Sequence, residues 1–333
     1  MKSKLDRLPR QDLIFLPTPL VALERLSAAL RGPRLFIKRD DLTGLGLGGN
    51  KTRKLEFLLG EAISQGCDCV ITGGAMQSNH CRQTAAAAAA VGLGCHLALG
   101  GEEPASVNGN LLLDRLFGAI VHWCGPDRKG ERIPRIAQDL HAQGHKPYII
   151  PYGGSDPIGA MGFVAAIGEL KEQLACLEIE PDAVVFASSS GGTQAGMVVG
   201  MDLYDLDLPV IGIGVDKGEA GDLPYETWLA TLAGQLASRL EMPERYTEAR
   251  FDVRKGYVGG GYGVVGDLER EAISLVARHE GVLLDPVYTG RAMGGLIDLI
   301  RKGEFDRTRT VVFWHTGGTP ALFAYAGDLM VGR

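Results

Sequence analysis

Short apolar runs alternate with helix-length segments along most of the chain. We expect strands at residues 35–41, 69–72, 95–99, 120–123, 148–150, 183–187, 210–215 and 311–314. Helices are predicted near residues 79–91, 107–117, 132–143, 159–175, 225–240, 267–280 and 290–302, with a further helix from Thr193. Strands that alternate with helices form βαβ units and parallel sheets. The pattern therefore predicts an α/β protein.

The chain is long enough for more than one hydrophobic core. Its 333 residues exceed what one core usually serves, so we expect two domains. The strand and helix units between about residues 53 and 160 could form one compact, smaller domain.

Composition and charge exclude several classes of protein. Apolar residues make up 45% and charged residues 22%, which is typical of a globular enzyme and unlike disorder. A net charge of -6 and the lack of a basic stripe argue against a nucleic-acid partner. The first fifteen residues contain no secretory signal, and the most apolar stretch, 85–101, is interrupted by His96, so we expect a cytoplasmic protein without a membrane span.

The cysteine and histidine pattern predicts no metal site. Six cysteines lie in apolar contexts, and we expect them to be reduced core thiols. Cys67 and Cys69 are one residue apart, and no second pair follows at zinc-site spacing.

The stretch 48–54, Gly-Gly-Asn-Lys-Thr-Arg-Lys, combines a helix start with three positive charges. The helix should begin near Asn50, whose side chain can cap its free N–H groups. Helix N-termini carry partial positive charge, so Lys51, Arg53 and Lys54 are unfavourable there unless a charged ligand or a chemical purpose compensates. This field and partial burial would lower the pKa of Lys51 and favour a neutral amine, which forms an imine with an aldehyde. A solvated lysine after a glycine turn is the alternative.

Four turns rich in glycine or hydroxyl groups occupy the positions where parallel sheets bind ligands, namely 73–80, 188–193, 259–263 and 316–319. The 188–193 turn joins a strand to a helix, so its N–H groups and hydroxyls can hold a phosphate. It lacks the Walker pattern and the dinucleotide glycine spacing, and a plain tight connection is the alternative. One phosphate together with one aldehyde-reactive amine indicates pyridoxal 5'-phosphate.

Single residues near these turns allow two interpretations each. Ser78 could cap the helix over 79–91, or place a hydroxyl beside the cofactor carbon that undergoes proton transfer. Tyr288 could pack in the core or point its phenol at a substrate. His80 and His315 join no ordered catalytic or metal-binding set, so we interpret both as structural.

Several stretches together resemble one family, the pyridoxal-phosphate enzymes of the tryptophan-synthase-β type, and within it the group of D-cysteine desulfhydrases and 1-aminocyclopropane-1-carboxylate (ACC) deaminases. The resemblance extends over essentially the whole chain. The matching stretches are 17–20, 37–41, 48–56, Gln77-Ser78-Asn79-His80, 261–263, 284–290 and 315–318.

The resemblance implies fold type II, with two open twisted parallel-sheet domains and flanking helices. It implies a large domain of residues 1–52 and 164–333, a small domain of residues 53–163, and a homodimer. Lys51 would bind the cofactor covalently, with Asn50, Asn79, Thr289 and Thr316 around its ring. The phosphate would be held by Ser189, Ser190, Gly191, Gly192 and Thr193, and the substrate would meet Gln77, Ser78, Asn79, Tyr262, Tyr288 and Thr316.

Two positions separate the branches of this group. ACC deaminases have a glutamate directly after the tyrosine and a leucine before the Gly-Gly turn, where this chain has Thr289 and Thr316. A hydroxyl partner leaves the pyridine nitrogen less protonated than a carboxylate would, which weakens the electron sink that cyclopropane opening needs. The resemblance therefore favours the desulfhydrase branch.

The function implied is β-elimination from a small amino acid, with D-cysteine giving pyruvate, ammonia and sulfide. Similar proteins eliminate sulfite from L-cysteate, and neither that activity nor ACC deamination is excluded by the sequence. A non-catalytic protein that has kept the cofactor pocket and a nucleotide-binding α/β protein are the alternatives of other classes.

Overall fold

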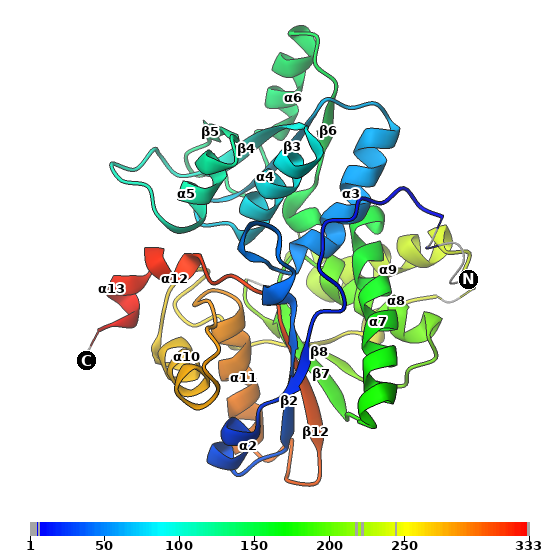
Figure 1. The fold of residues 1–333 in the computed structure, drawn as a ribbon, viewed down its shortest axis with the longest axis vertical. Coiled ribbons are helices and arrows are strands. Elements are labelled where there is room, and N and C mark those ends of the chain that lie inside the picture. Colours follow the sequence, from blue (N-terminus) through cyan, green and yellow to red (C-terminus); the bar gives the residue numbers. More distant parts are fainter. Residues whose placement is uncertain (1–4, 6, 217–218, 221–222, 244, 332–333) are drawn as a thin grey trace.

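Two sheets organise the chain, each in its own unit, and the units are stacked along the long axis (Figure 1). The computed structural model describes residues 5, 7–216, 219–220, 223–243 and 245–331. The large unit is the six-stranded sheet with its covering helices, and the small unit is the four-stranded sheet with its own. No helix of the described residues is long and apolar enough to cross a membrane.

The six-stranded sheet uses strands from both halves of the chain. Its order is β1-β2-β12-β7-β8-β11, and every neighbouring pair is parallel except β1 and β2. The strands are β1 (Leu20–Ala22), β2 (Arg34–Arg39), β12 (Thr310–His315), β7 (Ala183–Ser188), β8 (Val210–Gly214) and β11 (Asp252–Arg254). A two-stranded ribbon of β9 (Glu219–Ala220) and β10 (Leu223–Pro224) lies apart from it.

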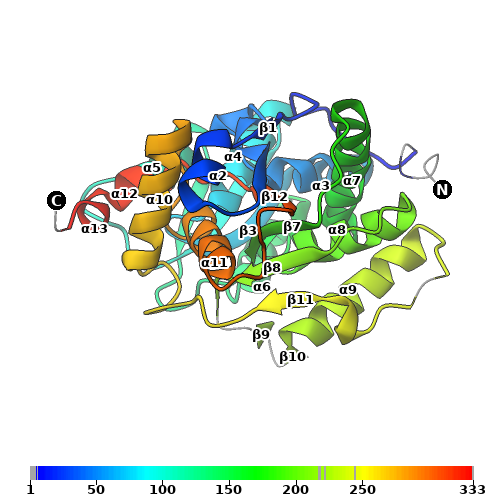
Figure 2. The same cartoon turned by 90° about the horizontal axis from the view of Figure 1, so that it is seen from below.

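Helices cover both faces of this sheet, because its central strands are apolar on both sides (Figure 2). One face buries Val184 and Phe186 against α7, α8 and α9, and the other buries Ala183 and Val185 against α2, α10 and α11. These helices are α2 (Glu24–Leu30), α7 (Pro157–Leu177), α8 (Gly192–Leu203), α9 (Tyr225–Arg239), α10 (Asp267–Glu280) and α11 (Thr289–Arg301).

The small unit repeats this layering with a fully parallel sheet. Its order is β5-β4-β3-β6, formed by β5 (Ile120–Trp123), β4 (Gly94–Gly100), β3 (Cys69–Ala75) and β6 (Pro147–Ile149). Val70 and Leu97 pack towards α3, α4 and α5, whereas Ile71 and Ala98 pack towards α6. The helices are α3 (Lys51–Ser64), α4 (Asn79–Val91), α5 (Gly109–Leu116) and α6 (Ile133–Ala142).

Short elements complete the fold. The chain ends in α12 (Ala321–Ala324) and α13 (Ala326–Leu329), which lie on the side of the molecule that carries α5 (Figure 1). Short 3₁₀ turns occur at η1 (Asp40–Leu42), η2 (Leu45–Leu47), η3 (Tyr152–Gly154) and η4 (Glu248–Arg250).

The α/β class and most of the predicted elements are confirmed, and the differences have local causes. The strand expected over 35–41 ends at Arg39, because Asp40 and Asp41 begin a 3₁₀ turn. Helix α2 and strands β1 and β11 were not predicted, since all three are short. All six cysteines are free thiols, but Cys176 is exposed rather than in the core as expected.

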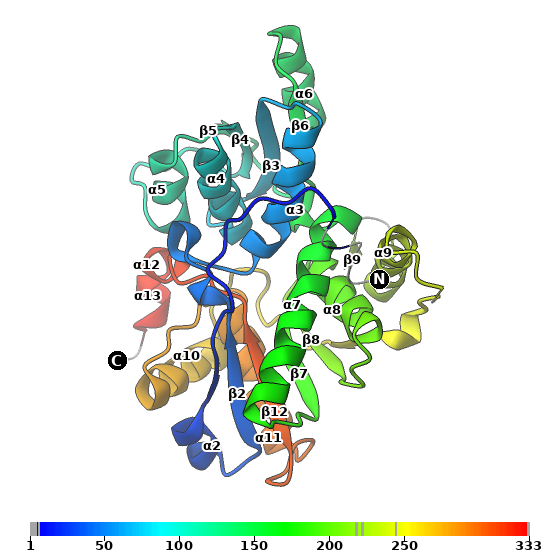
Figure 3. The same ribbon diagram turned by 45° about the vertical axis from the view of Figure 1, so that its right-hand side comes forward.

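A buried ion-pair network fixes the start of α3 against the large unit. Arg53 donates to Asp40 through Nε and Nη2, both at 2.8 Å, and through Nη1 to Glu169 of α7 at 2.9 Å. Lys38 of β2 also pairs with Glu169, and Trp314 of β12 donates to Asp40 at 2.8 Å. Arg53 therefore finds its counter-charges within the protein, where α3 packs on α7 (Figure 3).

We predict that Glu169→Gln destabilises the fold by about 3 kcal/mol, because Lys38 and Arg53 would stay buried with less compensation. Burial alone would raise the pKa of Glu169, but Arg53 and Lys38 lower it to about 2. Its contribution is therefore present above the usual carboxylate pKa of 4.5 and is lost as the pH falls towards 2.

Urea unfolding against pH tests this prediction. Glu180→Gln, an exposed change three residues after the end of the same helix, is the matched control and should stay within about 0.5 kcal/mol of the parent. Equal unfolding midpoints for the two variants would contradict a stabilising role for the network.

Candidate active site

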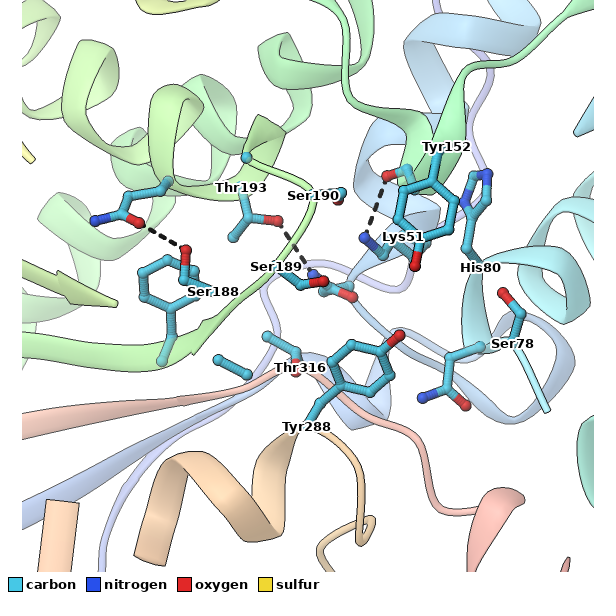
Figure 4. Close-up of a pocket in the computed structure, with 17 residues that line it drawn as sticks. Lys51, Ser78, His80, Tyr152, Ser188, Ser189, Ser190, Thr193, Tyr288 and Thr316 are labelled. Atoms are coloured by element: carbon cyan, nitrogen blue, oxygen red, sulfur yellow. Dashed lines mark hydrogen bonds between the residues drawn. The ribbon is translucent and has the colours of Figure 1, made fainter. Parts of the chain in front are cut away.

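A cavity lies between the two units, beside the starts of three helices (Figure 4). α3 begins there at Lys51, α4 at Asn79 and α8 at Gly192. This is where parallel sheets bind ligands. The cavity is lined by Asn50, Lys51, Ser78, Asn79, His80, Tyr152, Gly153, Phe186, Ala187, Ser188, Ser189, Ser190, Gly191, Thr193, Gln194, Tyr288 and Thr316.

Lys51 presents an amine that is easily deprotonated. Its Nζ donates to the carbonyl of Gly153 at 3.1 Å, and Lys54 Nζ donates to the same oxygen at 3.1 Å. Burial lowers the pKa of Lys51 to about 8 and, with the neighbouring Lys51, lowers the pKa of Lys54 well below its usual value. The predicted direction for Lys51 is confirmed, and the cause is burial.

Asn50 does not cap the helix as the sequence suggested. Its backbone is already helical, at φ -64° and ψ -20°, and its side chain bonds no N–H of the first turn. Instead, Asn50 Nδ2 lies 3.4 Å from Thr193 Oγ1, across the cavity in α8 (Figure 4). This contact joins the lysine helix to the predicted phosphate turn.

The turn from Ser188 to Thr193 has the form of an anion cradle. Gly191 has φ +95°, and a Cβ there would come within 2.6 Å of Trp228 Nε1. The Gly192 N–H donates to Ser155 Oγ at 3.1 Å, while the first N–H groups of any helix lack partners within that helix. Backbone donors and hydroxyls therefore meet where a phosphate can bind.

Ser78 caps the helix as the first interpretation expected, while its placement beside the cofactor carbon stays a prediction. Its Oγ accepts from the N–H of Cys81 at 3.2 Å and so caps α4, and the residue also lines the cavity. Asn79 Oδ1 accepts from Asn110 Nδ2 at 2.8 Å, which leaves the Asn79 amide as a donor. Gln77 does not line the cavity, since its side chain bonds the backbone of Asn108 and Asn110.

Three tyrosines meet at one end of the site. Tyr288 lines the cavity, and its hydroxyl lies 2.6 Å from that of Tyr262, which stands behind it. Tyr152 also lines the cavity and was not predicted. Burial raises the pKa of Tyr152 to about 12 and those of Tyr262 and Tyr288 well above their usual value, so these phenols are protonated at neutral pH.

The two threonines that distinguish the branches have different environments. Thr316 lines the cavity, directly after β12. Thr289 does not, because its hydroxyl donates to Asp285 Oδ1 at 2.7 Å and accepts from the Asp285 N–H at 2.7 Å. A contact of Thr289 with the cofactor ring stays a prediction. Gly192 also lies outside the lining residues.

His80 was interpreted as structural, but it lines the cavity. Its Nε2 lies 2.9 Å from Thr72 Oγ1, while Nδ1 has no hydrogen-bond partner among the described residues. Burial, together with Lys51 and Lys54, lowers the pKa of His80 well below its usual value, so the ring is neutral. Its place in the first turn after β3 was the sequence signal for this role.

His315 is structural, as interpreted. The side chain is fully buried, and Nδ1 accepts from the Gly317 N–H at 3.1 Å. It thereby holds the turn that presents Thr316 to the cavity.

One group of potential metal ligands lies away from this site. Asp68, Cys69 and His145 place ligand atoms within 4.8 Å of one another at the edge of the small sheet. The Asp68 carboxylate already accepts from the Lys146 N–H at 2.8 Å and lies 2.9 Å from His145 Nδ1, so its bonds are made within the protein. The cavity itself uses none of these residues.

Comparison with known proteins identifies the same chemistry. Residues 12–317 match the family described as "Pyridoxal-phosphate dependent enzyme". The chain is 45% identical to a D-cysteine desulfhydrase of Salmonella choleraesuis (strain SC-B67), covering 96% of this chain and 97% of the relative. The same values are found with the D-cysteine desulfhydrase of Salmonella newport (strain SL254).

Solved structures agree on the fold. A crystal structure of an ACC deaminase homologue superposes with a TM-score of 0.89 at 39% identity, covering 98% of this chain and 97% of the other. The processed threonine deaminase isoform 2 of Solanum lycopersicum superposes with a TM-score of 0.71 at 19% identity, covering 100% and 92%, and shares the fold. The predicted fold type II is confirmed.

Replacing Lys51 with Met tests the reactive amine in two ways. With its cofactor bound to Lys51, the parent protein should absorb visible light. The purified variant should lose this absorption, because no amine remains at that position to bind an aldehyde. Without cofactor it should also be more stable than the parent, by about 2 kcal/mol at pH 7, since a buried charge that partly faces the cavity is removed.

The dependence of stability on pH shows the direction of this effect. The pKa of Lys51 is about 8 in the fold and 10.5 in the unfolded chain, so the parent gains stability as the pH rises through this window. The Lys51→Met variant should lack that gain, whereas Lys302→Met, an exposed change, should retain both the gain and the absorption. Visible absorption that persists unchanged in the purified Lys51→Met protein would contradict the assignment of Lys51 as the amine that binds the cofactor.

Proposed function

Because the chain belongs to the pyridoxal-phosphate-dependent enzymes, we propose that it is a β-eliminating lyase that converts D-cysteine and water to pyruvate, ammonia and hydrogen sulfide. The observation that carries this proposal is the placement of Lys51, the Ser188–Thr193 turn, Ser78 and Tyr288 around one cavity. The relatives at 45% identity, which are D-cysteine desulfhydrases, support the choice of substrate.

The residues around the cavity fit the cofactor at both of its ends. Lys51 would supply the amine, and the turn from Ser189 to Thr193 would hold the phosphate with N–H groups and hydroxyls. Asn79 would donate its amide to the ring hydroxyl, and Asn50 and Thr316 would border the ring. When bound, pyridoxal phosphate supplies an aldehyde that condenses with amines and a ring that accepts electrons from the substrate Cα.

The chain offers three groups that can hold or move a proton at the substrate. Lys51 is neutral above pH 8 and can accept a proton. The Ser78 hydroxyl accepts a bond from Cys81, so its own proton remains available. Tyr288 is protonated and is paired with Tyr262, so it can donate. These roles suit removal of the Cα proton and departure of the sulfur.

Thr316 supports the desulfhydrase branch over ACC deamination. It places a hydroxyl at the cavity where the resemblance to ACC deaminases predicts a leucine. L-Cysteate elimination is the second candidate, because the same turn and amine would serve a sulfonate leaving group equally.

We also propose the division into a large domain of 1–52 and 164–333 and a small domain of 53–163. All strands of the small sheet fall between residues 69 and 149, and those of the large sheet fall outside that range. Helix α7 crosses the proposed boundary and packs on both α3 and α8. Residues 1–4, 6, 217–218, 221–222, 244 and 332–333 lie outside the described structure.

A substrate panel tests the activity. D-Cysteine should release pyruvate with a kcat/KM at least about tenfold above L-cysteate, D-serine and ACC. Ser78→Ala and Tyr288→Phe should each lower kcat by about 100-fold, since each removes a proton-bearing group. Ser238→Ala, an exposed change in α9, should leave kcat unchanged.

The pattern of turnover distinguishes the candidates. If L-cysteate is turned over faster than D-cysteine, the protein is an L-cysteate sulfo-lyase. If ACC is turned over faster, it is an ACC deaminase. A coloured protein that releases neither pyruvate from the three-carbon compounds nor 2-oxobutanoate from ACC would be a non-catalytic binding protein.

We propose a homodimer that buries the side of the molecule formed by α5, α12 and η2. Exposed apolar side chains gather there: Phe15 is 78% exposed, Leu47 64%, Leu116 70% and Phe323 66%. Helix α12 packs on α5, and Asn108 at the start of α5 bonds the Phe323 carbonyl. The segment of Leu47 joins them, because a Cβ at Gly46 would come within 3.2 Å of the Phe117 ring and one at Gly44 would clash with the Phe15 ring. A second copy would cover this apolar surface.

Leu116→Glu should shift the dimer to monomer in sedimentation, because it places a charge in the proposed contact. Leu177→Glu, at the end of α7 on the opposite side, is the matched control and should leave the mass unchanged (Figure 1). A monomeric parent protein would contradict the proposal.

A further inference from the structure

A loop of the small unit, residues 124–132, reaches the tyrosines of the large unit. The Arg128 guanidinium carbon lies 4.4 Å from the centroid of the Tyr262 ring. The Tyr262 hydroxyl lies 2.6 Å from that of Tyr288, and the two rings meet edge to face at 77°. Tyr288 lines the cavity, so a contiguous path leads from Arg128 to the reacting groups.

The position of Arg128 is not explained by a well-formed ion pair. Its Nη2 lies 3.7 Å from Asp216 Oδ1, and Lys129 Nζ lies 3.7 Å from Asp216 Oδ2, both beyond hydrogen-bond length. Its Nη1 is buried and has no hydrogen-bond partner among the described residues. The face of Tyr262 is therefore a principal contact of this cation.

We propose that Arg128 is a positioning residue for the elimination, which acts through Tyr262 on Tyr288. The guanidinium fixes the Tyr262 ring and favours the state in which the pair of phenols has given up one proton. The physical reason is that a phenolate ring carries more negative charge than a phenol, so its attraction to a cation above the ring is greater. The proposal rests on the proposed function, in which Tyr288 donates a proton to the substrate.

Most of the other groups around the two phenols oppose this charge state. Tyr262 faces Tyr152, Tyr288 and Tyr325, and Tyr288 faces Tyr262, Tyr152 and Asp285. Burial, Tyr152 and Tyr325 raise the pKa of Tyr262, whereas the hydrogen bond with Tyr288 and the charge of Arg128 lower it. Burial and all three of its neighbours raise the pKa of Tyr288. Removing the cation should therefore raise the pKa of the pair of phenols. The alkaline limb of kcat plotted against pH, which this pKa governs, should then move to higher pH.

Arg128→Met and Arg128→Lys, studied as holoenzymes, test the proposal. Arg128→Met should lower kcat for D-cysteine by about tenfold, with a smaller effect on KM. Its alkaline pH limb should move up by about one unit. Arg128→Lys keeps a cation over the ring and should recover most of both effects. Arg132→Met is the control in the same loop, since Arg132 is exposed and pairs with Asp127.

A second background isolates the path through Tyr262. Tyr262→Phe keeps the aromatic face but removes the hydroxyl, so adding Arg128→Met there should cause no further shift of the limb. Two results would overturn the proposal. In one, Arg128→Met lowers kcat equally at every pH without moving the alkaline limb. In the other, Arg128→Lys does not restore the activity that Arg128→Met loses.

The test can be separated from the proposed function. If the parent enzyme eliminates from no substrate, the phenolate titration of the holoenzyme by ultraviolet absorbance still measures the effect of Arg128. A phenolate pKa that rises in Arg128→Met and returns in Arg128→Lys supports the role of Arg128. A phenolate pKa that does not change in Arg128→Met refutes it.

Discussion

The contact on which the site depends is the buried pairing of Arg53 with Asp40 and Glu169. It joins the first turn of α3 to the end of β2 and to the middle of α7, and Trp314 of β12 bonds the same Asp40. Each partner is held by a second bond, so the start of α3 has one position relative to the large sheet. Lys51 lies two residues before Arg53, and its amine therefore meets the cavity at a fixed place. The charge that looked misplaced at a helix N-terminus is part of this support.

Burying cations to hold a helix has a consequence for the reactive amine. Lys51 and Lys54 share the carbonyl of Gly153, so two amines lie close together, and no carboxylate of the described residues is bonded to either of them. Burial then favours the neutral form of each, and His80 beside them is neutral for the same reason. Burial without a bonded carboxylate thus favours the neutral amine of Lys51, whereas Arg53, two residues further along the same helix, is fully paired.

The sequence predicts the parts of the site that depend on local pattern. Lys51, Ser78 and the Ser189–Thr193 turn follow from helix starts and glycine spacing, and all of them meet at the cavity except Gly192. Tyr152 could not be placed, because it meets Tyr262 of the other unit. His80 was interpreted as structural, although its position in the first turn after β3 indicated the cavity. Thr289 differs from its neighbour: Tyr288 lines the cavity, whereas the hydroxyl of Thr289 bonds Asp285, and its contact with the cofactor ring stays a prediction. Neighbours in sequence need not share an environment, and only packing decides between them.

The residues around the cavity come from both units. Ser78 caps α4 of the small unit, and Lys51 begins α3 beside the proposed boundary, while the phosphate turn and Tyr288 belong to the large unit. A cavity that both units line is complete only when they are held together, and Asn50, just before this boundary, contacts Thr193 at one end. Arg128 over Tyr262 bridges it at the other. A cation at that second bridge affects the phenols only while the units are in contact, so the proton-donating strength of Tyr288 depends on the closeness of the two units.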